Sequence, residues 1–118
     1  MHYHFEGELT AGDCKQHFPL RFEVPEGWGV LEMDFAFEPA RVQGIANRLT
    51  LTLFDPDGFR GAGHRGGADH HVYIGETEAT PGYLPGPLPS GSWVVEIDTH
   101  MIMPGEPVRY TLDVAILT

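Results

Sequence analysis

The chain of 118 residues is poor in cysteine and in basic residues. Cys14 is the only cysteine, so no disulfide can form within the chain, and burial alone must hold the fold together. This fits a reducing compartment. Lysine and arginine total 7 against 17 aspartates and glutamates, for a net charge of −10. Such a chain repels phosphate backbones and anionic headgroups, which disfavours nucleic acid and membrane surfaces as partners.

Targeting and membrane-spanning signals are missing as well. No apolar run approaches the roughly 20 residues that a membrane helix needs, and the first residues are neither basic nor apolar as in a secretory leader. We therefore expect a cytoplasmic protein. The length suits one domain covering residues 1–118, and a hydrophobic content of 42% is enough for a packed core.

Helical periodicity is hard to find, whereas apolar and polar residues alternate with period two along most of the chain. This alternation predicts strands near residues 3–5, 18–24, 31–37, 49–53, 72–74, 93–97 and 110–116, with 101–103 as an uncertain eighth. Glycine and proline turns separate them. Parallel sheets need crossover connections that are usually helical, so the pattern predicts an all-β fold: an antiparallel, jelly-roll-like β-sandwich of seven to eight strands.

Three local features refine this prediction. Pro19 interrupts a regular strand and indicates an edge strand or a bulge. Trp93 falls on the apolar side of its strand and should lie in the core. Between Pro39 and Asn47 a turn of helix is possible.

The histidines are the first candidates for chemistry, because imidazole is a common metal ligand. His2 and His4 share one face of the first strand, and His64, His70 and His71 lie on or beside a glycine-rich loop. A metal site needs further ligands and a supporting shell, which spacing alone does not supply. We favour solvent-facing and loop histidines, keep His2, His4, His70 and His71 as weak metal candidates, and expect no cofactor.

The glycine-rich segment 58–67 is locally basic and invites a phosphate-loop interpretation, but the required spacing and following helix are absent. We expect a flexible surface loop in which Arg60, His64 and Arg65 could contact an anion or a neighbouring domain. The preceding Asp55-Pro56-Asp57-Gly58 resembles the start of a calcium loop without its closing glutamate. A turn explains it better.

Other residue types offer equally little for catalysis. Ser90 stands in a turn, and Cys14 lacks an orienting third group. Trp28 and Tyr83 sit in loops, so we expect them to be exposed and available to a sugar or a protein partner. No complete catalytic constellation is present, and the chain is not expected to be an enzyme by itself.

The segment ATPGYLPGPLPSGSW, residues 79–93, is distinctive: a proline- and glycine-rich loop that delivers an aromatic residue into the next strand. With FPLRFEVP at 18–25, LTLFDPDG at 51–58 and VRYTL at 108–112, it resembles the β-sandwich that precedes the catalytic domain in CehA/McbA-type metallohydrolases of the PHP (polymerase and histidinol phosphatase) superfamily. The resemblance covers nearly the whole chain. It implies a neighbouring catalytic domain that supplies the metal ligands for phosphoester or related hydrolysis.

Three functions follow as hypotheses. The first is a non-catalytic accessory module of such a metal-dependent phosphohydrolase, acting in domain docking, oligomerisation or substrate access, with the catalytic domain or a second copy as partner. The second is a free-standing carbohydrate-binding module, which needs a concave face lined with exposed aromatic residues. The third is a small metal-binding protein, which needs His2, His4 and the histidines of 64–71 to converge on one ion.

Overall fold

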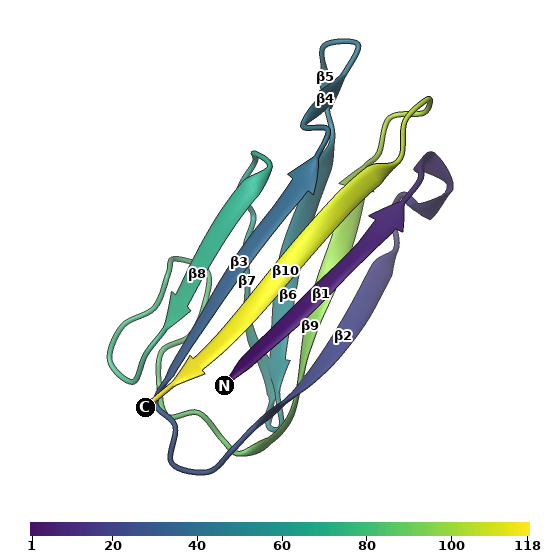
Figure 1. Cartoon of the computed structure of the whole chain (residues 1–118). Coiled ribbons are helices and arrows are strands. Elements are labelled where there is room, and N and C mark those ends of the chain that lie inside the picture. The colour runs from purple at the N-terminus through teal and green to yellow at the C-terminus, as the bar shows by residue number, and fades with distance from the viewer.

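The structure, a computed structural model, describes residues 1–118, and its strands pair in antiparallel fashion throughout. Two four-stranded sheets stack face to face, with the front sheet of Figure 1 in the order β1-β10-β3-β8 and the rear sheet in the order β2-β9-β6-β7. We call them sheet A and sheet B. The strands of sheet A are β1 (His2–Leu9), β10 (Val108–Leu117), β3 (Val30–Glu38) and β8 (Asp69–Ile74), and those of sheet B are β2 (His17–Val24), β9 (Gly91–Met101), β6 (Arg48–Asp55) and β7 (Gly58–Ala62).

The connections identify the topology. Leaving aside the small hairpin of β4 (Arg41–Val42) and β5 (Ile45–Ala46), every connection except the β6–β7 turn passes from one sheet to the other. Two four-stranded sheets linked in this way form a jelly roll. The fold class predicted from the alternating pattern is therefore confirmed. The helical content is one short turn, η1 (Ala11–Asp13). No helix is long and apolar enough to span a membrane.

Alternating side chains from both sheets fill the space between them. Trp93, Phe35 and Leu112 are at most 1% exposed, and Leu51 and Leu53 reach into the same core from β6. This core of 22 buried residues, continuous from sheet to sheet, is what the period-two alternation predicts, and Trp93 lies in it as expected.

All seven predicted strands are present, and Pro19 lies in β2, an edge strand of sheet B, as its missing N–H requires. Three segments differ from the prediction, and the first is β7, where residues 58–62 form a strand in place of the expected loop. Residues 39–47 form no helical turn; they contain the β4–β5 hairpin, in which Gln43 and Gly44 both adopt the positive φ of a type I′ turn. Residues 101–103 are no separate strand, because β9 itself runs on to Met101.

One end of the sandwich gathers most of the features singled out from the sequence. β6, β8 and β10 all finish there, and β9 begins there beside the last residue of β2. Both chain termini, the loop containing Trp28, the β6–β7 turn and the loop of residues 75–90 consequently lie at this end (Figure 1). We call it the terminal end.

Core packing yields a first prediction. Leu51→Ala removes a side chain that is 1% exposed and leaves a cavity between the sheets, so the free energy of unfolding should fall by about 2–5 kcal/mol. Ile45→Ala, at a residue that is 50% exposed on the hairpin, should change it by less than about 0.5 kcal/mol. Urea denaturation of both variants measures the difference. Equal losses would contradict the two-sheet core.

Candidate functional site

A β-bulge at the terminal end turns Arg60 toward the core. Phe54 pairs with Phe59 and Leu53 pairs with Gly61, so Arg60 is the extra residue of β7 and has no partner on β6. A bulge re-aims side chains locally. Here it brings the guanidinium within 5.4 Å of the centre of the buried Trp93 ring, and Arg60 is only 6% exposed.

The buried guanidinium binds the loop of residues 80–90, the Pro/Gly loop. Arg60 Nε donates to Leu84 O (2.8 Å), Nη1 to Pro87 O (3.0 Å) and Nη2 to Gly86 O (2.9 Å). Nη1 also lies 3.0 Å from Asp55 Oδ2, a carboxylate that is 8% exposed. The backbone N–H of Leu84 donates in turn to Arg60 O. Charged donors thus satisfy three loop carbonyls, while a buried counter-ion balances the charge.

Buried side chains fix the remainder of the same loop. Tyr83 inserts into the core and donates its hydroxyl to Leu51 O (3.2 Å), and burial raises the pKa of that hydroxyl to about 12. Trp93 Nε1 donates to Pro89 O (2.9 Å). Gly61 makes room for this approach, because a Cβ there would stand 2.5 Å from Tyr83 Cα. The Pro/Gly loop is therefore held at both ends and in the middle.

Apolar side chains nevertheless remain outside this anchored loop. Phe59 is 57% exposed and Leu84 is 49% exposed, and both line one shallow groove with Pro85, Pro87 and Pro89. We call it the Phe59–Leu84 groove. Asp55, Asp57, Arg60 and Gly86 complete its lining. A groove whose backbone is already fixed loses little conformational entropy when a partner covers it.

Two of the residues predicted to be exposed at this end are buried. Tyr83 is 5% exposed, so the prediction that it offers a free aromatic surface is wrong; an aromatic ring in a proline-rich loop is here an anchor. The prediction that Arg60 could contact an anion is wrong for the same reason, because its N–H groups donate to partners inside the protein. Residues 58–62 form a strand and not a flexible loop. Trp28 is half-buried and packs against the core.

The other two basic residues of segment 58–67 stay near the surface. His64 is exposed, and its carbonyl accepts a long hydrogen bond from Arg48 (3.5 Å). Arg65 is half-buried and donates to His71 O (3.4 Å). They line no pocket with Arg60, so the three basic residues of the segment do not form one site.

The histidines named as weak metal candidates do not gather at one point. His70 faces the core against Phe35 and donates Nε2–H to Gly67 O, whereas His71 faces outward and pairs with Asp34 (2.7 Å). His2 and His4 lie on β1, at the opposite edge of sheet A, and both contact Asp113, at 3.1 and 2.7 Å. His2, His4 and the histidines of segment 64–71 therefore do not converge on one ion, which is the condition that the third hypothesis needs.

His4 is the best-connected of these residues. Its Nδ1 lies 2.7 Å from Asp113 Oδ1 and its Nε2 lies 3.2 Å from Glu6 Oε2. The hydrogen bond to Asp113, followed by the one to Glu6, raises the pKa of His4 above its usual 6.5. Asp113 stands directly opposite Asp34 in the register, so two like charges meet here and a histidine flanks each.

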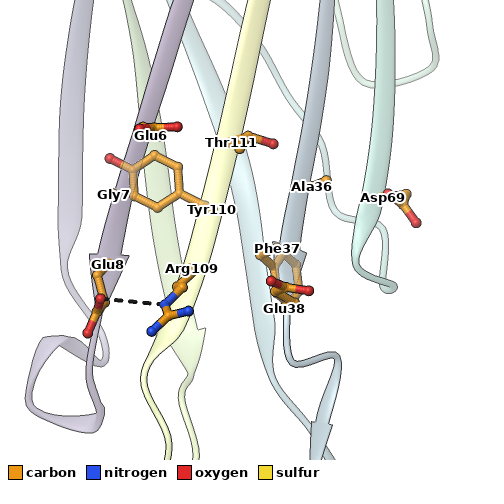
Figure 2. A pocket seen from close by; sticks show the side chains of 10 residues that line it. All are labelled: Glu6, Gly7, Glu8, Ala36, Phe37, Glu38, Asp69, Arg109, Tyr110 and Thr111. Carbon is orange, nitrogen blue, oxygen red and sulfur yellow. Dashed lines mark ion pairs between the residues drawn. The ribbon is translucent and has the colours of Figure 1, made fainter.

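The largest hollow on the surface, about 810 Å³, is shallow and lies over sheet A (Figure 2). Its charged residues are Glu6, Glu8, Glu38, Asp69 and Arg109. Among these five, only Glu8 and Arg109 pair with each other, at 3.7 Å. Glu6 and Glu8 lie on β1, Arg109 on β10, Glu38 on β3 and Asp69 on β8. Figure 2 shows that these side chains do not converge on one point. The hollow is an acidic, solvated face, in keeping with the net charge.

Sequence reasoning missed a different cluster, on the outer face of sheet B. His17 Nδ1 lies 2.6 Å from Asp98 Oδ1 and 3.1 Å from Glu96 Oε1. The hydrogen bond to Asp98 raises the pKa of His17, and burial together with the neighbouring Asp98 raises the pKa of Glu96. The alternation in β9 already placed Glu96 and Asp98 on one face. The pairing of β2 with β9 brings His17 to the same place, and neither strand's own sequence predicts that pairing.

No protein-family model matches the chain, and no curated protein matches it. The resemblance to the sandwich of CehA/McbA-type enzymes therefore stays a prediction.

The buried guanidinium gives a second prediction. Arg60→Met leaves the Asp55 carboxylate buried without a counter-ion and three loop carbonyls without their donors, so the free energy of unfolding should fall by roughly 3–5 kcal/mol. Arg65→Met, at a half-buried arginine with one long hydrogen bond, should lose less than about 1 kcal/mol. Thermal or urea denaturation compares them. A loss at Arg60 as small as that at Arg65 would show that the loop does not depend on this contact.

The environment of His4 gives a third prediction. Asp113→Asn removes the charge that favours the imidazolium, so an NMR titration should find the His4 pKa nearer to 6.5 than in the unchanged protein. The raised value stabilises the folded state below pH 6.5, and this contribution is lost as pH rises through the folded-state pKa. Asp34→Asn, which leaves both partners of His4 in place, should move the His4 pKa less. A larger change in the His4 pKa with Asp34→Asn than with Asp113→Asn would contradict the assignment of Asp113 as the residue that raises it.

Proposed function

We propose that this chain is a non-catalytic accessory module that docks on a protein domain through the Phe59–Leu84 groove, and that the domain is a PHP-type metal-dependent phosphohydrolase. The observation that carries the proposal is the contrast within the groove. Its backbone is anchored by a buried arginine, while its large apolar side chains stay half-exposed.

Such a contrast is what a docking surface needs. Phe59 packs edge-on against Phe54, yet more than half of it stays in water, and both Phe59 and Leu84 gain further hydrophobic free energy when a partner covers them. The Arg60 contacts meanwhile fix the path of the loop in advance, so binding need not order it. Proline at 85, 87 and 89 further restricts the backbone.

The position of the groove also supports a domain partner. The Pro/Gly loop and Thr118 both lie at the terminal end of the sandwich (Figure 1), so a domain joined to the C-terminus would stand next to the groove. Asp57, which is exposed, lines one part of the groove, so the partner surface should combine apolar side chains with a basic one.

The resemblance supplies the class of partner. In CehA/McbA-type enzymes the catalytic domain follows such a sandwich, and the Pro/Gly loop is the segment that carries the likeness most specifically. The same loop builds the groove. The polar residues outside it lie in separate small groups on the outer faces of the two sheets, which favours an accessory role over catalysis by this chain itself. A single cysteine is in keeping with a cytoplasmic setting.

The glycan-binding alternative has less support. It asks for exposed aromatic residues over a concave face, whereas four of the ten residues that line the hollow on sheet A are carboxylates, and Tyr83 is buried. Self-association through the same groove is the nearer alternative, because a twofold contact could also cover Phe59.

The proposal is tested by titrating the ¹⁵N-labelled chain with the PHP-type catalytic domain encoded with it. Amide shifts should concentrate in residues 54–59 and 82–89. Phe59→Ser should weaken binding at least tenfold, equivalent to about 1.4 kcal/mol, because the groove loses its largest exposed anchor. Ile45→Ser, at a residue on the hairpin that is 50% exposed compared with 57% for Phe59, is the matched control and should bind unchanged.

Three outcomes would contradict the proposal: no such domain encoded with the chain, shifts confined to the outer faces of the sheets, or equal effects of the two serine variants. Light scattering decides the remaining alternative, since a dimer that Phe59→Ser dissociates would assign the groove to a second copy.

A further inference from the structure

A cluster of three potential metal ligands lies on the outer face of sheet B, at the opposite end of the β2–β9 pair from the Pro/Gly loop. His17 begins β2 and stands directly opposite Asp98 of β9, while Glu96 follows on the same face opposite Pro19. The ligand atoms of the three side chains all lie within 4.8 Å of one another. Two hydrogen-bonded strands, one of them central in the sheet, carry all three, so the arrangement is supported by rigid backbone.

Asp98 is held in place more firmly than a surface carboxylate needs to be. It is only 6% exposed although it points away from the core. One carboxylate oxygen faces His17 Nδ1 at 2.6 Å, and the other accepts the hydroxyl of Thr52 at 2.5 Å. Orienting a ligand carboxylate by such an outer hydrogen bond is a common feature of protein metal sites.

Glu96 adds a second carboxylate at close range. Its side chain is 23% exposed, and Glu96 Oε1 reaches the same His17 nitrogen at 3.1 Å. Two neighbouring carboxylates with little access to water repel each other and favour an added positive charge between them. In the apo protein that charge is the shared Nδ1 proton of His17, which sits where a cation could replace it.

We propose that His17 Nδ1, Glu96 and Asp98 bind one divalent transition-metal ion, for which Zn²⁺ is the natural probe. One imidazole nitrogen and two carboxylate oxygens form a three-ligand set of the kind that leaves the fourth position of zinc open. Two carboxylates balance the double charge. Imidazole selects against Mg²⁺ and Ca²⁺, which prefer oxygen alone.

The geometry needs only a small adjustment. Ligand atoms at zinc bonding distance in a tetrahedron stand about 3.4 Å apart, compared with the present 2.6 and 3.1 Å around His17 Nδ1. The His17 side chain is 69% exposed and can withdraw by that amount without disturbing the core. Proton release from Nδ1 accompanies binding. The site is separate from the Phe59–Leu84 groove, so either proposal can fail alone.

The experiment uses the untagged full chain, stripped with a chelator and titrated with Zn²⁺ by calorimetry, with NMR to locate the ion. We expect one site, with perturbations at His17, Glu96 and Asp98. His17→Ala should weaken zinc binding at least tenfold, whereas His71→Ala should leave it unchanged. His71 is the matched control because it also pairs with an aspartate at 2.7 Å but contacts no second carboxylate.

His2 and His4 with Asp113 form the competing surface, so His4→Ala is included as well. Zinc affinity that depends on His4 and not on His17 would overturn the proposal, as would the absence of binding at millimolar Zn²⁺, which would leave the cluster a hydrogen-bonded ion pair only. Because His17 is exposed, its alanine variant should keep the amide spectrum of the folded chain, and loss of affinity in that variant reports on the ligand itself.

Discussion

The buried contact between Arg60 and the Pro/Gly loop is the interaction on which the terminal end depends. A guanidinium beneath a surface loop would be unfavourable if its N–H groups were unpaired, and here the Asp55 carboxylate and the carbonyls of Leu84, Gly86 and Pro87 pair them. Trp93 supplies the apolar side of the contact. The loop therefore follows one path across the end of the sandwich, and its exposed Leu84 stands next to Phe59 along one groove.

Sequence reasoning succeeded where side-chain alternation decides the structure. Trp93 and its neighbours in the core follow directly from period two, and so does the position of Pro19 at an edge. It failed at segment 58–67 because a single bulge between Leu53 and Phe54 turns Arg60 inward, and a bulge leaves no clear mark in a sequence of glycines. It failed at Tyr83 because a loop residue is normally expected at the surface.

The histidine clusters also depend on strand pairing that the sequence does not reveal. His2 and His4 were visible as neighbours because they lie on one strand, yet Asp113, the residue they share, comes from a strand more than 100 positions away. His17 was not visible at all as a partner of Asp98, since only the register of β2 with β9 joins them. Long-range strand pairing sets these clusters, and it has to be known before charges on separate strands can be assembled into a site.

The most direct test of this account is the mobility of the Pro/Gly loop in the free protein. Backbone ¹⁵N relaxation of residues 83, 84, 86 and 88 should give order parameters of about 0.85, the value of rigid backbone, because Arg60 and the core hold this segment without a partner. Order parameters below about 0.6 at these residues would contradict the account, since a groove with a mobile wall is not prepared for docking.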